Sequence, residues 1–280
     1  MEDITVKELL AATGGELLQG DKAAKILGVN TDSRTVKAGE VFLPLAGERF
    51  DGHDYIEKAL SAGAEGCLCA RVPETLLPGK FYIKVPDTLL ALKDLAAWYR
   101  ARFTIPFVQV TGSVGKTTTK EMIAAVLRTA LRTQWTEKNY NNEIGLPLTA
   151  LRVDEHTRFF VAEMGASHIG EIARLTRIAP PNTAIVLKVG VAHLGEFGSR
   201  ERIAQAKSEI VQGLLPGGTA VLNADDEHVV PMAGLANGDV LWFGLGSSQE
   251  PEVRAIDVTA DRSDHAEFTL VDADGNHTPV

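Results

Sequence analysis

The sequence predicts an α/β protein of two domains, a small amino-terminal α/β domain followed by a larger domain with a mostly parallel sheet. Three observations predict this fold. A length of 280 residues is typical of about two domains, and 45% hydrophobic with 23% charged residues is typical of globular chains. In the second part of the chain, nearly continuous apolar strands alternate with helical patterns. This alternation indicates a parallel sheet that is covered on both faces.

Residues 1–84 are expected to form the first domain. Short strands and helical patterns alternate there, and glycines are frequent, as in the stretch from Asn30 to Ala46. A helix-period pattern then runs from Asp87 to Phe103 and leads into an apolar strand at residues 107–111. We therefore place the domain boundary near Val85 and expect the second domain to span residues 85–280.

The second domain has further apolar strands, at residues 159–163, 183–189, 219–223 and 240–243. The final stretch, residues 253–280, has a different pattern, which predicts antiparallel strands with a hairpin turn at residues 272–276. The chain ends about four residues after this turn. Because a domain seldom ends inside a returning strand, we expect a truncated chain.

The charge of the chain excludes some classes of partner. A net charge of -9 at pH 7 argues against a nucleic-acid-binding surface, which requires clustered Lys and Arg. Any phosphate site must therefore be local. The acidic start, Met1-Glu2-Asp3, lacks a basic segment followed by an apolar core, and no run of about 18 apolar residues occurs. We expect a cytoplasmic protein without membrane insertion.

The two cysteines, Cys67 and Cys69, lie in an apolar run. As residues of one strand they would point both thiols to the same face, because side chains alternate along a strand. Buried free thiols are the favoured interpretation, and a metal site is the alternative.

A glycine-rich loop follows the strand at residues 107–111 and opens an amphipathic helix predicted over residues 117–131. The apolar side of this helix is predicted to contain Ile123, Val126, Leu127 and Ala130. This context is typical of a P-loop, in which Gly112 and Gly115 let backbone N–H groups close around phosphate oxygens. Lys116 would reach the terminal phosphates, and Thr117 could bind magnesium. The spacing T-G-x-x-G-K-T-T is shorter than G-x4-G-K-[ST], and a turn that only caps the helix is the alternative. The loop residues assigned to nucleotide binding are Thr111, Gly112, Ser113, Val114, Gly115, Lys116, Thr117 and Thr118.

Two side chains are candidates for a metal site beside this loop. Glu163 ends an apolar strand, so its carboxylate should emerge at the carboxyl edge of the parallel sheet, next to the P-loop. His193 follows the strand at residues 183–189 and could reach the same edge, although a structural role is the alternative for a lone histidine.

Lys207 lies on the apolar stripe of a helix predicted over residues 200–214, with Ser208 on the opposite, polar face. A lysine that extends its amine from an apolar face to water is the alternative. Partial burial lowers the pKa of a lysine and leaves some neutral amine. A neutral amine can add carbon dioxide to give a carbamate, an anion that could bind metal.

Several motifs, taken together over nearly the whole chain, resemble those of the Mur ligase family. They are Thr31-Asp-Ser-Arg34, Asp51-Gly-His-Asp54, Thr111-Gly-Ser-Val-Gly-Lys-Thr-Thr118, Asn139-Tyr-Asn-Asn-Glu-Ile-Gly-Leu-Pro147, Glu163-Met-Gly-Ala-Ser-His-Ile-Gly-Glu171 and Ala192-His-Leu-Gly-Glu-Phe-Gly-Ser199. The resemblance implies a catalytic set of Lys116, Glu163, His193 and Lys207, and a metal-binding set of Thr117, Glu163, His193 and Lys207, with Lys207 carbamylated.

The resemblance also implies binding roles for residues outside the P-loop. Asn223 would lie near the adenine, and Ser33 and Arg34 would hold the UDP end of a precursor. Asn141 and Asn142 would face the substrate near the γ-phosphate, while turn formation remains the alternative for this asparagine pair.

The implied function is an ATP-dependent, Mg²⁺-requiring amide ligase of peptidoglycan precursor synthesis. It would add D-alanyl-D-alanine to UDP-N-acetylmuramoyl-tripeptide through an acyl phosphate, with a precursor-binding first domain and a P-loop ATPase second domain. The family has a third domain that binds the dipeptide and that this chain would lack. We therefore expect a chain that binds its ligands without completing ligation. The expected oligomeric state is a monomer.

Two other functions are the alternatives. The Mur ligase that adds the third amino acid shares the motifs of the first domain, but the stretches 163–166 and 141–145 favour the dipeptide-adding branch. A non-catalytic module that binds precursor or nucleotide is the second alternative. The presence of every member of the catalytic set argues against it.

Overall fold

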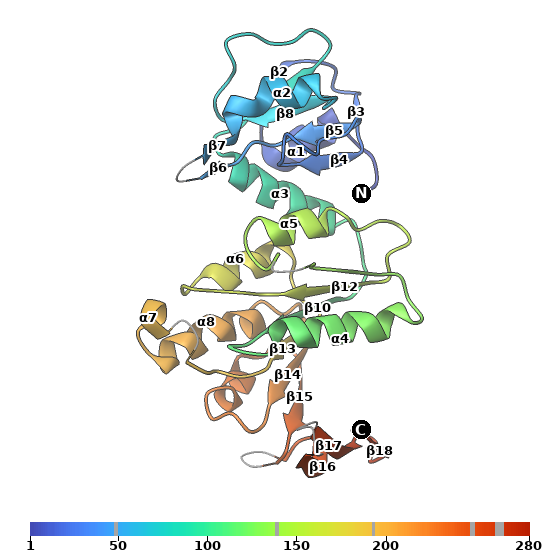
Figure 1. The fold of residues 1–280 in the computed structure, drawn as a ribbon, viewed down its shortest axis with the longest axis vertical. Coiled ribbons are helices and arrows are strands. Elements are labelled where there is room, and N and C mark those ends of the chain that lie inside the picture. Colours follow the sequence, from blue (N-terminus) through green and yellow to red (C-terminus); the bar gives the residue numbers. More distant parts are fainter. Residues whose placement is uncertain (48–49, 138–139, 192–193, 247–249, 261–265) are drawn as a thin grey trace. The chain divides into compact units, whose positions relative to one another are not determined.

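The computed structural model describes residues 1–47, 50–137, 140–191, 194–246, 250–260 and 266–280, and the chain separates into two compact units (Figure 1). The first unit comprises residues 1–104 and 143–157, and the second comprises residues 105–142 and 158–280. The units do not coincide with the predicted division after residue 84. Helix α3 (Thr88–Arg100) packs on α5 (Gly145–Ala150) inside the first unit, and the Tyr99 hydroxyl donates to the carbonyl of Val153 at 2.6 Å.

The first unit is built on a five-stranded mixed sheet of order β2-β9-β8-β5-β4. Strand β2 is antiparallel to β9, and the other neighbours are parallel. The sheet strands are β2 (Glu16–Gln19), β4 (Gly28–Asn30), β5 (Glu40–Phe42), β8 (Gly66–Cys69) and β9 (Phe81–Lys84). Two short antiparallel pairs accompany it, β1 (Ile4–Thr5) with β3 (Lys25–Ile26), and β6 (Ala46–Gly47) with β7 (Phe50–Asp51).

The remaining helices of the first unit are α1 (Val6–Thr13), the short 3-10 helix η1 (Gly52–Tyr55) and α2 (Ile56–Ser61). Helix α1 begins at a capping box, in which the Thr5 and Glu8 side chains each bond the other's backbone N–H. Cys67 and Cys69 are free and buried in a core with Phe42, Ile56 and Tyr82, which confirms the prediction of buried thiols.

The second unit is built on a sheet in which the described residues form nine strands, ordered β11-β12-β10-β13-β14-β15-β16-β17-β18. Neighbours from β11 to β16 are parallel, and the last two pairings are antiparallel. The strands are β10 (Phe107–Thr111), β11 (Thr133–Trp135), β12 (Phe159–Glu163), β13 (Thr183–Val186), β14 (Thr219–Asn223), β15 (Asp239–Gly244), β16 (Val253–Ala260), β17 (Ala266–Val271) and β18 (His277–Pro279). The predicted mostly parallel sheet is confirmed.

The helices of the second unit are α4 (Lys116–Arg128), α6 (Glu171–Ile178), α7 (Leu194–Phe197), α8 (Arg200–Gln212) and the 3-10 helix η2 (Val230–Leu235). Helix α4, green in Figure 1, packs against β10 and β12. No helix among the described residues has both the length and the apolar character needed to cross a bilayer.

The turn after β17, the end of β13 and the edge strand β11 can each be compared with what the sequence predicted. The turn after β17 is present as predicted, with the Asp272 carboxylate accepting the N–H groups of Asp274 and Asn276. Strand β13 ends at Val186 rather than Val189, because the Val189 N–H bonds the Asp226 side chain instead of a neighbouring strand. Strand β11 lies at the edge of the sheet and was not predicted.

The predicted apolar face of the P-loop helix is wrong in part. Val126 is 69% exposed and Ala130 is also exposed, whereas Lys120 and Ala124 are the buried residues of α4. The face that packs on the sheet therefore includes a lysine, which hydrophobic periodicity alone assigns to solvent.

Candidate functional site

The loop between β10 and α4 has the backbone of a phosphate-binding loop. Gly115 is the N-cap of α4 with φ of 81°, a left-handed conformation that favours glycine, and no side chain caps the helix. The first N–H groups of α4 therefore lack a side-chain cap, as an anion site at a helix N-terminus requires. The Lys116 Nζ folds over the loop and donates to the carbonyl of Gly112 at 2.9 Å.

Neighbouring strands hold both sides of this loop. The Thr111 hydroxyl donates to the carbonyl of Met164 after β12 at 2.9 Å. On the other side, the Ser113 N–H donates to Lys188 O at 2.7 Å, and the Ser113 hydroxyl accepts the Gly190 N–H at 2.8 Å. These contacts give Thr111 and Ser113 a structural role, and their predicted contact with nucleotide stays a prediction.

Glu163 lies at the carboxyl end of β12, beside the start of α4, as the parallel sheet predicted. Its side chain is 3% exposed. The Thr117 hydroxyl donates to its Oε2 at 2.6 Å, and Asn141 Nδ2 donates to its Oε1 at 2.9 Å. The structure thus brings together Lys116, Thr117, Asn141 and Glu163 at one edge of the sheet.

Asn141 reaches Glu163 because the chain after β12 passes very close to it. The Gly165 N–H donates to the carbonyl of Asn141 at 3.1 Å. A Cβ on Gly165 would meet the Asn141 side chain at 3.0 Å, so only glycine fits without displacement. Asn142, the second predicted asparagine, is exposed.

Lys207 is 5% exposed on α8, and no described residue accepts a hydrogen bond from its amine. Burial, with a further contribution from the positive charge of Lys116, lowers the pKa of Lys207 to about 8. A lysine of this pKa carries a fraction of neutral amine at neutral pH, as carbamylation requires.

The prediction that Ser208 faces solvent is wrong. Ser208 is 6% exposed, and Glu209 next to it is 7% exposed, because α6, β13 and η2 all pack around α8. The Glu209 carboxylate accepts the N–H groups of Gly170 at 2.6 Å and Ala173 at 2.9 Å. It therefore caps the N-terminus of α6, where a negative charge is favoured.

The burial of Lys207 makes a testable prediction for stability. In buffer free of carbon dioxide, the free energy of unfolding should rise as pH increases from about 8 to 10.5, because the unfolded chain then binds a proton that the folded chain has lost. The full rise is about 3 kcal/mol for one lysine.

Urea unfolding of wild type and Lys207→Met between pH 7 and 10.5 measures this effect as a difference, so that other alkaline groups cancel. The stability of wild type relative to the variant should increase across the window. A constant difference would show that the folded chain keeps the amine charged.

His193, predicted as catalytic and as a metal ligand, lies outside the described residues. Among the residues that the structure does describe, no three His, Cys, Asp or Glu side chains gather as a metal-binding group. Of the four predicted metal ligands, the described residues thus include Thr117 and Glu163, which are in contact, and Lys207.

Asn223 lies at the carboxyl end of β14, where an adenine contact was predicted. Its Nδ2 donates to Leu187 O at 2.7 Å, and its Oδ1 accepts the Asp225 N–H at 2.9 Å. Asp225 in turn accepts the backbone N–H groups of Leu245 at 2.5 Å and Gly246 at 3.1 Å, after β15. Asn223 therefore belongs to a network that fixes the loops at this end of the sheet.

Ser33 and Arg34 line a cavity of about 380 Å³ in the first unit. The other lining residues are Thr31, Asp32, Phe42, Phe50, Tyr55 and Lys58. The rings of Phe50 and Tyr55 stack with centroids 5.1 Å apart, and both are partly exposed. The cavity thus combines two cationic side chains with an aromatic pair.

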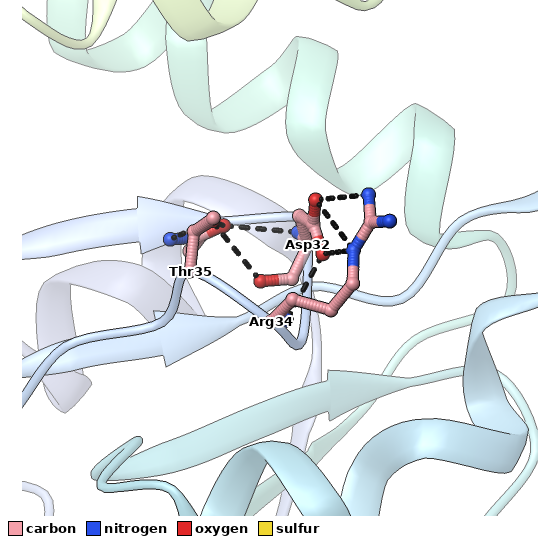
Figure 2. A network of polar contacts seen from close by, with 4 residues as sticks. Asp32, Arg34 and Thr35 are labelled. Atoms are coloured by element: carbon pink, nitrogen blue, oxygen red, sulfur yellow. Dashed lines mark hydrogen bonds and ion pairs between the residues drawn. The ribbon is translucent and has the colours of Figure 1, made fainter.

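Figure 2 shows how Arg34 is held. Its Nε donates to Asp32 Oδ1 at 2.9 Å and one terminal nitrogen donates to Oδ2 at 2.7 Å. This contact lowers the pKa of the Asp32 carboxyl to about 2. The guanidinium, 78% exposed, has its remaining N–H groups directed away from Asp32.

Phe50, Tyr55 and Lys58 were missed by sequence reasoning. Phe50 and Tyr55 flank the motif Asp51-Gly-His-Asp54, and Lys58 lies three residues after Tyr55. The histidine of the motif shows why these side chains are in place. His53 bonds Asp51 through Nδ1 at 2.7 Å and accepts the Ala70 N–H through Nε2 at 3.0 Å. These two hydrogen bonds fix the turn between Phe50 and Tyr55. The Asp-Gly-His-Asp motif was therefore the sequence signal that could have identified the aromatic residues of the cavity.

Comparison with known proteins extends these observations. Residues 110–278 match the family model described as Mur ligase middle domain, and residues 25–100 match that described as Mur ligase family, catalytic domain. A UDP-N-acetylmuramoyl-tripeptide--D-alanyl-D-alanine ligase of Synechocystis sp. is 43% identical over 222 residues, which cover 79% of this chain and 49% of the relative.

Two solved structures are similar to all or most of this chain. MurF from Acinetobacter baumannii matches with a TM-score of 0.92 at 33% identity, covering 100% of this chain and 61% of that one. MurF ligase from Thermotoga maritima in complex with ADP matches with a TM-score of 0.78 at 33% identity, covering 90% and 57%. The chain thus spans about half to three fifths of the length of these relatives. With a family model matched over more than half of its residues, the chain belongs to the Mur ligase family.

Proposed function

We propose that this chain supplies precursor binding and ATP binding to a ligase that adds D-alanyl-D-alanine to UDP-N-acetylmuramoyl-tripeptide. The observation that carries the proposal is the group formed by Lys116, Thr117 and Glu163 at the carboxyl ends of β10 and β12. The names of the Synechocystis and Acinetobacter relatives support this choice within the family.

The residues at this edge suit ATP with Mg²⁺. The uncapped N-terminus of α4 and Lys116 would bind the terminal phosphates. Thr117 and Glu163 offer the oxygen ligands that Mg²⁺ prefers. The ion would offset the negative charge of the phosphates and of the substrate carboxylate when they approach each other. The ADP in the Thermotoga relative supports the nucleotide part of this proposal.

The chemistry needs activation of a carboxylate, which is a poor acyl donor. Transfer of the γ-phosphoryl group of ATP to the peptide carboxylate would release ADP and give an acyl phosphate. The amine of the dipeptide would then attack the acyl carbon and displace phosphate. The chain's own residues would bind and align the reactants. Lys207, whose pKa of about 8 leaves neutral amine, would be carbamylated and carry the negative charge of a carbamate toward the metal site.

The cavity in the first unit would hold the UDP end of the precursor. Arg34 and Lys58 are suited to the diphosphate, and Phe50 and Tyr55 to a flat base. We assign precursor binding to residues 1–84 and ATP binding to residues 85–280, and we propose a cytoplasmic monomer.

Calorimetry with UDP-N-acetylmuramoyl-tripeptide tests the precursor site. Arg34→Ala should weaken binding about tenfold or more, the effect of one lost hydrogen bond to a charged group, and should leave the affinity for Mg-ATP unchanged. Lys25→Ala is the matched control, because Lys25 forms an exposed ion pair with Asp3 in the same unit, away from the cavity. An equal loss in both variants would contradict the assignment of the cavity.

Mass spectrometry of the product tests the branch of the family. In a ligase that contains this chain, tripeptide precursor and D-alanyl-D-alanine should give the pentapeptide precursor. Extension of a dipeptide precursor by one amino acid, without use of the tripeptide, would instead assign the chain to the ligase that adds the third residue.

A further inference from the structure

Lys120 is the most deeply buried charged side chain near the candidate site. It lies on α4, one turn after Thr117, and is 0% exposed. Its Nζ donates to the backbone carbonyl of Thr136 at 2.6 Å and to Glu121 Oε1 at 2.6 Å. Burial of an ammonium group is costly unless hydrogen bonds compensate for the lost water, so these two bonds define where the amine can lie.

Thr136 connects this amine to Glu163. It is 0% exposed and directly follows β11. Its N–H donates to Val161 O at 3.0 Å, and its hydroxyl accepts the N–H of Glu163 at 3.0 Å. A short chain of hydrogen bonds therefore runs from Lys120 through Thr136 to the backbone of Glu163.

Asn141 contacts the same glutamate as Thr136. Its side chain donates to Glu163 Oε1, and its carbonyl accepts the Gly165 N–H. Glu163 is thus held twice, by Thr136 through its backbone N–H and by Asn141 through its carboxylate.

We propose that Lys120 is a positioning residue, which acts through Thr136 to fix Glu163 for binding of the metal–nucleotide complex. The proposal rests on the assignment of Glu163 to the metal site. A buried ammonium that holds a backbone carbonyl restrains the end of β12 more strongly than a neutral donor, because hydrogen bonds to charged groups are stronger. The carboxylate then needs little rearrangement when the cation binds.

Hydrogen exchange of the Glu163 amide tests the proposal in metal-free protein. Thr136→Val keeps the size of the side chain and leaves the carbonyl that Lys120 bonds, but removes the acceptor for the Glu163 N–H. Exchange of this amide should become about tenfold faster or more in Thr136→Val and in Lys120→Met. Thr136→Ser, which retains the hydroxyl, should exchange as wild type does.

Binding of Mn²⁺ with a non-hydrolysable ATP analogue provides the second measurement. Lys120→Met and Thr136→Val should each weaken Mn²⁺ binding about 10–100-fold, as is common for groups that support a metal ligand. The double variant should be no weaker than the worse single variant, because both changes break one chain of contacts.

Arg128→Met is the matched control. Arg128 is another cation of α4 and stacks on Trp135, the residue before Thr136, at 4.4 Å, but it has no bond to Thr136 among the described contacts. Its removal should leave Mn²⁺ affinity and Glu163 exchange unchanged.

Each outcome decides a separate point. Wild-type Mn²⁺ affinity and wild-type exchange in folded Lys120→Met and Thr136→Val would overturn the positioning role, as would additive losses in the double variant or an equal loss in Arg128→Met. If Lys120→Met does not fold, Thr136→Val still tests the proposal, because it keeps the hydrogen bonds of Lys120 and breaks only the link from Thr136 to Glu163. Wild-type Mn²⁺ affinity and wild-type exchange in this variant would then overturn the positioning role. Failure of wild type itself to bind the Mn²⁺–nucleotide complex would count against the proposed function, while the exchange measurement still tests the positioning.

Discussion

Lys116→Ala is expected to reduce the affinity of the chain for Mg-ATP by about 100-fold. Lys116 is the charged side chain that folds over the phosphate loop, where its Nζ donates to Gly112 O at 2.9 Å. When ATP binds, this amine would leave the neutral carbonyl of Gly112 and donate to anionic phosphate oxygens instead. Hydrogen bonds to charged groups contribute about 1.5–3 kcal/mol each, and 1.4 kcal/mol corresponds to a factor of ten in affinity.

Isothermal titration calorimetry with Mg-ATP measures the effect directly. Lys116→Arg should recover part of the affinity, since it keeps the charge but not the shape of the ammonium group. Arg128→Met, which removes one positive charge from the other end of α4, should bind as wild type does. If Lys116→Ala also bound as wild type, the loop would not be a nucleotide site.

Glu163→Gln is expected to remove the contribution of Mg²⁺ to nucleotide binding. The substitution keeps the size of the side chain, and the new amide can still accept from Asn141 Nδ2 through its oxygen and donate to the Thr117 hydroxyl through its nitrogen, so the site should retain its shape. It removes the negative charge that would bind the cation. Because loss of a group that only supports a metal ligand costs about 10–100-fold, loss of a ligand's charge should cost about 100-fold or more in affinity for Mg²⁺.

Titration of ATP with and without Mg²⁺ separates this effect from damage to the loop. Wild type should bind ATP more tightly with Mg²⁺ than without it, whereas Glu163→Gln should show little difference between the two conditions. Its affinity without Mg²⁺ should equal or exceed that of wild type, since one negative charge near the phosphates is gone. A full Mg²⁺ effect in the variant would place the metal elsewhere.

The parts of the site that sequence predicted are those formed by contiguous residues or by the ends of parallel strands. The P-loop is one continuous strand, loop and helix, so the pattern of residues 107–131 alone was enough to predict it, although contacts with Met164, Lys188 and Gly190 also hold it in place. The contact of Thr117 with Glu163 joins distant residues, but the carboxyl ends of parallel strands meet at one edge, which made their proximity predictable.

Contacts made by irregular segments were not predictable in the same way. The contact of Asn141 with Glu163 depends on the path of a loop and on the close approach of Gly165, which no periodicity encodes. The burial of Lys120 contradicts the usual pattern, because its side chain is held by the backbone carbonyl of Thr136, which directly follows an edge strand that was itself not predicted. The aromatic part of the cavity was missed for the same reason, since Phe50 and Tyr55 are placed by a turn.

The interleaving of the two compact units affects the order in which the chain can fold during synthesis. The first unit includes residues 143–157, and the Tyr99 hydroxyl donates its hydrogen bond to the carbonyl of Val153. At about 5–20 residues per second, a ribosome needs about 3–10 s to proceed from residue 104 to residue 157. During this interval, the β10–α4 segment of the second unit emerges before the first unit can be complete. The amino-terminal unit of the nascent chain therefore finishes folding only after part of its neighbour has been made, and residues 1–104 expressed alone would expose the surface of α3 that α5 normally covers.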